Sequence, residues 1–250
     1  MELTESSDLR SENTSETPRH SRYLALALGA AAFLLVVAIT SGAGPGLDPD
    51  AMAYVGAATS FAHHGTFRVP SSTWDAEDST SSLTSWPPGL PIAMAIPQRL
   101  GVSPLASARI VTATAAFITA AVLFVLLEGA VGSGGAVVGV IAVLVTPAFA
   151  GVHMSVLSEP LFLASLVMTL FGMTRRPRRP PTTGIPAAMA AITRYAGVCV
   201  PMAVVLWFFF VDRKPLRQRF SDAAKAAVVP AIVIGAWRSE ERRVGKECRL

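Results

Sequence analysis

YLALALGAAAFLLVVAIT, residues 23–40, is an apolar run without a charged side chain. About 20 apolar residues in a helix cross the hydrocarbon core of a bilayer. The segment before it, residues 1–22, is long and rich in Ser, Thr and Glu, which predicts a disordered tail. A cleaved signal peptide, the competing interpretation, would begin with a short basic region. We therefore expect an uncleaved span, with Arg19 and Arg22 favouring a cytoplasmic N-terminus.

The composition of the whole chain is typical of a membrane protein. Of 250 residues, 52% are hydrophobic and 15% are charged, whereas soluble domains carry about 25% charged residues. Long uncharged blocks account for the deficit, which predicts several spans. The net charge of +4 could suit nucleic acid, but the basic residues form short clusters between apolar runs, where they orient spans. We therefore expect the lipid bilayer, and no nucleic acid, as a partner.

The apolar runs predict an all-α, polytopic transmembrane helical bundle in the cell membrane. The densest basic cluster, residues 175–179, follows the fourth predicted span and falls on the cytoplasmic side. One helix over residues 182–211 would be about 45 Å long and would bury Arg194. We therefore expect a break there that leaves Arg194 at the outer boundary. Spans are expected near residues 23–41, 105–127, 135–150, 157–173, 183–193, 196–211 and 223–237.

The segment 42–104 is the one long polar connection between predicted spans, and it is acidic and poor in bases. This character suits an extracytoplasmic loop. We expect two interfacial helices within it, near residues 50–64 and 90–100, the second opened by Pro87 and Pro88.

The last residues, 238–250, differ from the rest of the chain. RSEERRVGKEC, residues 238–248, resembles the translation of a sequencing-adapter oligonucleotide. If the seventh span runs outward, this basic stretch also falls on the wrong side of the membrane. We therefore expect a non-native tail on an N-terminal fragment; an ordinary basic tail is the alternative.

Cysteine and histidine predict neither a disulfide framework nor a protein metal site. Cys199 lies inside an apolar run and Cys248 lies in the tail just described. The histidines show no zinc-ligand spacing; they are His20, His63, His64 and His153. No cofactor is therefore predicted with certainty, and a divalent cation remains open.

Several charged residues at predicted span ends have both a functional and a structural interpretation. Arg194 could clamp a phosphate through two guanidinium nitrogens, or it could snorkel from a helix end. Arg109 has the same two interpretations. Glu159 could face a cavity, where it would bind an acceptor or a cation, or it could complement the dipole of its helix.

Five motifs, taken in order, resemble the C-fold (GT-C) glycosyltransferases, integral membrane enzymes related to protein mannosyltransferases and aminoarabinose transferases. The family usually has many more spans and often a C-terminal outer domain. The motifs are DPDAMAYVGAATSFAHHGTF (48–67), WPPGLPIAMAIPQRLG (86–101), SARIV (107–111), LSEPLF (157–162) and ITRYAGV (192–198).

This resemblance implies transfer of a sugar from a polyprenyl-phosphate carrier to an acceptor at the extracytoplasmic face. It implies Asp50 as the catalytic base, because the spacing from Asp50 to Tyr54 fits an acidic-then-tyrosine pattern; Asp48 is the second candidate. A positioned carboxylate can accept the proton of an attacking hydroxyl. The other expected site residues are Arg194 and Arg109 for the donor phosphate, and Glu159, Tyr54 and His153 for the acceptor or the cavity.

Two other classes stay open at this stage. A transporter subunit would place charges near the bilayer midplane and show internal repeats, and we find no repeat. A non-catalytic membrane scaffold, or an inactive fragment, is the other alternative. The transferase alone requires Asp50, Glu159 and Arg194 to meet in one outward cavity.

Overall fold

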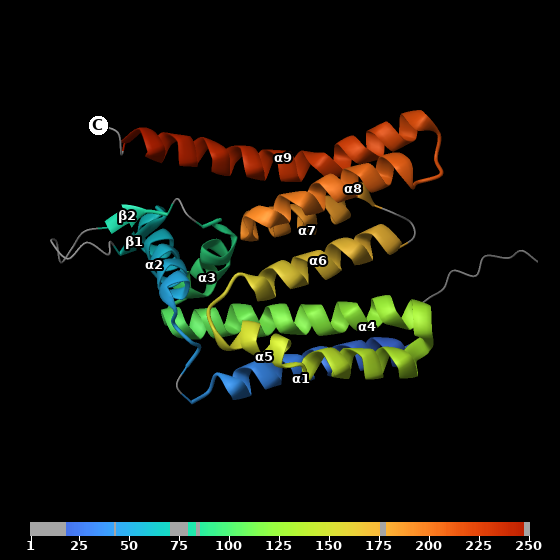
Figure 1. The fold of residues 1–250 in the computed structure, drawn as a ribbon, viewed down its shortest axis with the longest axis horizontal. Coiled ribbons are helices and arrows are strands. Elements are labelled where there is room, and N and C mark those ends of the chain that lie inside the picture. Colours follow the sequence, from blue (N-terminus) through green and yellow to red (C-terminus); the bar gives the residue numbers. More distant parts are fainter. Residues whose placement is uncertain (1–18, 43, 71–79, 84–85, 176–178, 248–250) are drawn as a thin grey trace, which may run out of the picture.

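The computed structural model describes residues 19–42, 44–70, 80–83, 86–175 and 179–247, and these residues form an all-α bundle (Figure 1). One short antiparallel ladder, which the sequence did not predict, joins β1 (Arg68–Pro70) to β2 (Thr80–Ser82). A 3₁₀ helix, η1 (Tyr195–Val198), precedes α8. The helices are α1 (Arg19–Ile39), α2 (Pro49–His64), α3 (Gly89–Arg99), α4 (Pro104–Leu144), α5 (Pro147–Met154), α6 (Glu159–Thr174), α7 (Pro180–Thr193), α8 (Cys199–Phe210) and α9 (Leu216–Glu247).

The expected helical membrane bundle is confirmed. Within the described residues, three helices are long and apolar enough to cross a bilayer: α1, α4 and the Leu216–Ser239 part of α9. Two shorter apolar segments, Glu159–Thr174 and Tyr195–Phe210, lie between them. Many large apolar side chains on these helices are exposed in the isolated chain, Leu34 and Ile232 among them. A lipid environment covers such surfaces without cost.

The long helix α4 is in fact two arms that fold back on each other at Gly132. This glycine has φ +74° and ψ 169°, a conformation that side chains rarely tolerate. Figure 1 shows the second arm returning beside the first and beside α1. Phe124 of the first arm and Val140 of the second share one buried cluster with Val36 of α1. The two arms correspond to the predicted spans 105–127 and 135–150.

Several element bounds differ from the prediction. Residues 19–22 are helical and begin α1, so they do not belong to a tail; residues 1–18 lie outside the described residues. The second arm of α4 ends at Leu144, because Thr146 accepts a hydrogen bond from the Phe149 amide (3.1 Å) and starts a separate helix. The last helix begins at Leu216 rather than near 223, and its backbone continues to Glu247.

The chain crosses from end to end of the bundle, so loops gather at two opposite ends (Figure 1). One end, here called the basic end, holds the start of α1, the α6–α7 junction and the α8–α9 junction. These segments carry Arg19, Arg22, Arg175, Arg179, Arg213, Lys214, Arg217 and Arg219. The opposite end, here called the site end, holds α2, α3, the β-ladder and the α7–α8 junction.

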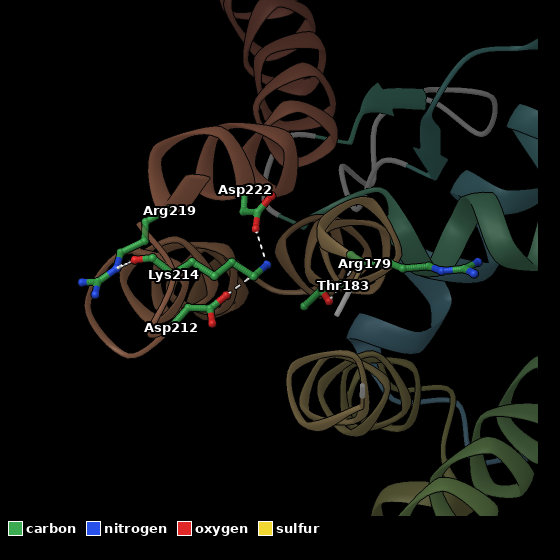
Figure 2. A network of polar contacts seen from close by, with 6 residues as sticks. All are labelled: Arg179, Thr183, Asp212, Lys214, Arg219 and Asp222. Carbon is green, nitrogen blue, oxygen red and sulfur yellow. Dashed lines mark hydrogen bonds and ion pairs between the residues drawn. The ribbon is translucent and has the colours of Figure 1, made fainter. Parts of the chain in front are cut away.

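At the basic end, a polar network fixes the α8–α9 junction (Figure 2). The Lys214 ammonium lies 2.6 Å from Asp222 Oδ2 and 3.3 Å from Asp212 Oδ2. Its hydrogen bond to Asp222 holds the pKa of Lys214 above the usual value of 10.5. The Arg219 guanidinium donates to the Lys214 carbonyl at 2.6 Å. Both aspartates therefore pair with one lysine, and these contacts hold the start of α9 at Leu216 against the loop before it.

Candidate functional site

A pocket of about 280 Å³ opens at the site end, between the start of α2, the head of α6 and the α7–η1 junction. Its walls combine carboxylates, a guanidinium, hydroxyls and aromatic rings. Segments far apart in the sequence contribute to it, because α2, α6 and α7 all end or begin at this end of the bundle (Figure 1). The lining residues are Asp50, Tyr54, Trp86, Pro87, Leu157, Ser158, Glu159, Thr193, Arg194, Tyr195 and Ala196.

The first turn of α2 separates the roles of its two aspartates. Asp48 is the N-cap, and its Oδ1 accepts a hydrogen bond from the Ala51 amide at 2.7 Å. Pro49 follows at the first helical position, where its missing N–H costs nothing. Asp50 is exposed and lines the pocket, whereas Asp48 does not. The cap thus occupies Asp48 and leaves Asp50 available to a ligand.

An ion pair between Glu159 and Arg194 crosses the pocket. Glu159 stands in the first turn of α6, where the helix dipole favours a negative charge. Arg194 has an extended backbone (φ −144°, ψ 146°) and ends α7, so the predicted break at this residue is confirmed. Their side chains are 33% and 37% exposed. Because both remain accessible, a ligand can reach either partner.

The tight α7–α8 junction depends on Gly197. A Cβ at this position would collide with the Ala190 carbonyl of α7. Gly89, at the start of α3, approaches the same helix, and its Cβ would lie 2.7 Å from the Ile192 carbonyl. These close contacts hold Arg194 and Thr193 against the segment that carries Trp86.

Tyr54 forms the deep wall of the pocket. Its ring is buried with 4% exposure, within a cluster that includes Leu90 and Val156, and it meets Trp86 edge-on at 6.4 Å. Burial raises the pKa of the Tyr54 phenol above its usual value of 10.0. A hydrogen bond with the Ser158 side chain acts in the opposite direction, and the Asp50 charge again raises the pKa. The phenol is therefore neutral at physiological pH.

Besides Asp48, two of the predicted site residues, Arg109 and His153, do not line the pocket. The Arg109 guanidinium donates to the Thr40 carbonyl at 2.5 Å, where it satisfies the C-terminal end of the α1 segment. His153 is buried at 1% exposure; its Nδ1 donates to the Phe149 carbonyl at 2.8 Å and its ring stacks on Phe149 at 4.0 Å. Burial lowers the pKa of His153 below 6.5. Neither side chain lines the pocket; each instead binds a backbone carbonyl within the bundle.

Sequence reasoning missed several pocket residues, among them the polar residues Ser158 and Thr193. Ser158 and Thr193 each adjoin a predicted site residue, Glu159 and Arg194, and each is buried. Pro87 was expected only to open the helix that follows, and both Pro87 and Trp86 line the pocket. Proximity to a candidate charge in the chain was the signal that could have found the first two.

Among the residues that the structure describes, no three His, Cys, Asp or Glu side chains are grouped closely enough to hold a metal ion. The pocket does carry two carboxylates, Asp50 and Glu159. It is a mixed anionic and cationic site with aromatic walls, suited to a ligand that combines hydroxyl groups with a phosphate.

The fold and the pocket define an all-α membrane protein with a polar site at the end of its bundle. The sequence model of the dolichyl-phosphate-mannose-protein mannosyltransferase family matches residues 85–237. The chain belongs to this family, and it is a membrane glycosyltransferase of the GT-C type. The match includes Trp86, Glu159 and Arg194 and begins after α2, which carries Asp50. Among curated proteins and solved structures, no match is found.

Proposed function

We propose that this protein transfers a sugar from a polyprenyl-phosphate carrier to an acceptor hydroxyl at the extracytoplasmic boundary of the cell membrane. The observation that carries the proposal is the meeting of Asp50, Glu159 and Arg194 in one pocket. These residues lie at the ends of three different helices, and more than 100 residues separate Asp50 from Arg194 in the chain. The family match supports sugar transfer, and the apolar helices support a membrane setting.

The orientation follows from the charge of the two ends. Basic loops face the cytoplasm in most membrane proteins, so the basic end and the N-terminus are assigned to the cytoplasm. The pocket then faces outward, where a lipid-linked sugar on the outer leaflet can reach it.

The chemistry assigned to Asp50 is general base catalysis. The acceptor oxygen forms a bond with the anomeric carbon of the sugar while its proton moves to the Asp50 carboxylate. The bond from the anomeric carbon to the phosphate oxygen breaks, and the electron pair leaves with the polyprenyl phosphate. Attack opposite the leaving group inverts the configuration at the anomeric carbon.

Arg194 is assigned to the phosphate that leaves. A guanidinium can bind two phosphate oxygens at once and offsets the charge that develops on them. The Glu159 carboxylate pairs with this guanidinium. Glu159 therefore holds Arg194 over the pocket before the donor arrives, and its free oxygen can then meet an acceptor hydroxyl.

An apolar groove gives the carrier lipid a path to the pocket. It measures about 350 Å³ between α8 and α9 and has almost no polar wall. Val198 of η1 lies at one edge of this groove, and Ala196, two residues earlier, lines the pocket. A prenyl chain in the groove would thus hold its phosphate near Arg194. The other lining residues are Pro201, Met202, Val205, Leu206, Ala227, Pro230, Ala231 and Ile234.

The direct test is Asp50→Asn in the full-length protein, reconstituted with a polyprenyl-phosphate sugar. We expect sugar transfer to fall by about 10²–10⁴-fold, the usual contribution of a positioned base, with expression unchanged. The matched control is Asp48→Ser, which keeps an oxygen for the helix cap and removes the carboxylate. Transfer lost in Asp48→Ser but retained in Asp50→Asn would reassign the base to Asp48. Transfer retained in both would reject the mechanism and favour a scaffold role.

A divalent cation between the two pocket carboxylates is a separate question. Assays after treatment with EDTA decide it: transfer that is lost and then restored by Mg²⁺ or Mn²⁺ would add a cation to the site.

A further inference from the structure

The loop before α2 and the loop before α6 are joined by a short backbone bridge. Gly46 and Ser155 pair in parallel. The Gly46 amide donates to the Met154 carbonyl at 2.7 Å, and the Val156 amide donates to the Gly46 carbonyl at 3.2 Å. These two peptide hydrogen bonds connect segments that lie about a hundred residues apart in the chain.

Along the chain, each pocket carboxylate follows its side of the bridge by the same number of residues. Asp50 follows Gly46 by four residues (46 to 50), and Glu159 follows Ser155 by four residues (155 to 159). Both carboxylates lie in the first turn of the helix that follows. A shift of one strand of the bridge would therefore move one carboxylate relative to the other.

Gly46 is exposed and Ser155 is partly buried, but Val156, the next residue, reaches into the core. Val156 is buried at 1% exposure and packs in one cluster with Ala51 and Tyr54 of α2 and Leu90 of α3. The strand on the α6 side is thus anchored by its own side chain. The strand on the α2 side has no side chain at Gly46, so it depends on a close approach of its backbone.

That approach leaves little space at Gly46. A Cβ there would lie 2.8 Å from the Ser155 hydroxyl oxygen and 3.6 Å from the Met154 carbonyl. Rotation of the Ser155 hydroxyl can relieve the contact with a single methyl group. A β-branched side chain adds two further carbons at the same place, which rotation of one hydroxyl cannot relieve.

We propose that Gly46 is a positioning residue, which sets the distance between the Asp50 carboxylate and the Glu159–Arg194 pair through its bridge to Ser155. This inference rests on the proposed function for its catalytic consequence. It does not place Gly46 in contact with any substrate.

The test compares Gly46→Val with Gly46→Val/Ser155→Gly, which removes the side chain that the valine meets. Gly42→Val is the matched control, because a Cβ at Gly42 has no neighbouring atom within 4 Å. We expect kcat to fall on the order of 10²-fold in Gly46→Val, the loss typical of a small displacement of a reacting group. The donor KM should stay unchanged, because Arg194 is held by α7. The double variant should recover most of kcat.

A distance measurement reports on the bridge independently of activity. Spin labels are attached at Met52 of α2 and Leu170 of α6, two exposed positions, after replacement of Cys199 and Cys248. The Met52–Leu170 distance distribution should shift or broaden in Gly46→Val and return in the double variant. If Gly46→Val does not fold, Gly46→Ser, which places one further atom beyond the Cβ, should give a smaller shift of the same kind.

An unchanged distance distribution in a folded Gly46→Val protein would overturn the inference. A shifted distribution with unchanged kcat would also overturn it, since the bridge would then not position the base. If the parent protein transfers no sugar, the proposed function fails, and the distances still decide whether the bridge sets the spacing of α2 and α6.

Discussion

At the scale of single residues, environment decides which charged groups are free for chemistry. From the sequence, Asp50 was the first candidate for the base and Asp48 the second, and both Arg194 and Arg109 were candidates for the donor phosphate. In the structure, Asp48 caps α2 and Arg109 binds the Thr40 carbonyl, whereas Asp50 and Arg194 line the pocket. Such assignments depend on which backbone groups lie nearby in space, and no spacing along the chain reveals them. The roles of Asp50 and Arg194 in the reaction stay predictions.

His153 predicts a pH dependence of stability. It lies outside the candidate spans, and its Nε2 is buried without a hydrogen-bond partner among the described residues. Because burial lowers the pKa of His153 in the folded state, the unfolded chain binds a proton first as the pH falls. The contribution of the neutral His153 to the free energy of unfolding should therefore be fully present above about pH 6.5. It should decrease as the pH falls below that value.

Thermal unfolding in detergent between pH 8 and pH 5 measures this effect. We expect the pH dependence to be smaller in His153→Phe, which keeps an aromatic ring beside Phe149. His64→Gln is the control, because His64 is exposed and its replacement should leave the profile unchanged. A profile that His153→Phe does not alter would show that another group titrates.

At the scale of helices, the existence of elements was more predictable than their bounds. Hydropathy places the last span near residue 223, yet α9 begins at Leu216. The reason is that Arg217 and Arg219 lower the hydropathy of the first turns although they are compatible with a helix. The Lys214–Asp222 ion pair and the contact from Arg219 to the Lys214 carbonyl stabilise this start. A hydropathy pattern does not reveal polar contacts of this kind, because it averages over the residues that make them.

Helix packing between α7 and α9 depends on small residues, and Gly184 offers a test. A Cβ at Gly184 of α7 would collide with the Ala226 carbonyl of α9. We expect Gly184→Ala to lower the free energy of unfolding by about 1–3 kcal/mol, the usual cost of overpacking. Titration with denaturant measures the change.

Gly235→Ala is the matched control for this substitution. Gly235 lies inside α9, and a Cβ there meets no atom within 4 Å. Alanine is a better helix former than glycine by about 0.5–1 kcal/mol, so this variant should be as stable as the parent or slightly more stable. Equal losses in both variants would contradict the close contact between α7 and α9.

At the scale of the whole molecule, the charge pattern along the sequence anticipated the arrangement in space. Basic clusters that alternate with apolar runs predicted that the chain returns repeatedly to one side. The structure brings the start of α1, the α6–α7 junction and the α8–α9 junction to one end (Figure 1). The exact position at which α4 reverses could not be predicted from the sequence. Residues 128–134 contain three glycines, Gly129, Gly132 and Gly134, and of these only Gly132 has a positive φ.

The proposed orientation predicts which ends a membrane-impermeant thiol reagent can reach. In a background without Cys199 and Cys248, Met52→Cys at the site end should react in intact cells. Gln218→Cys, exposed at the start of α9, should react only after the membrane is permeabilised. The reverse pattern would invert the orientation, and labelling of both positions in intact cells would contradict a bundle with two separate ends.

The polar pocket and the apolar groove are formed by different parts of the chain, so substitutions can change one without the other. Every residue that lines the polar pocket lies before Gly197, whereas most of the apolar groove comes from α8 and α9. Under the proposed function, substitutions in the later helices would alter which carrier chain lengths and saturations are accepted. Descendants of this protein could thus change lipid preference while they retain the same sugar chemistry.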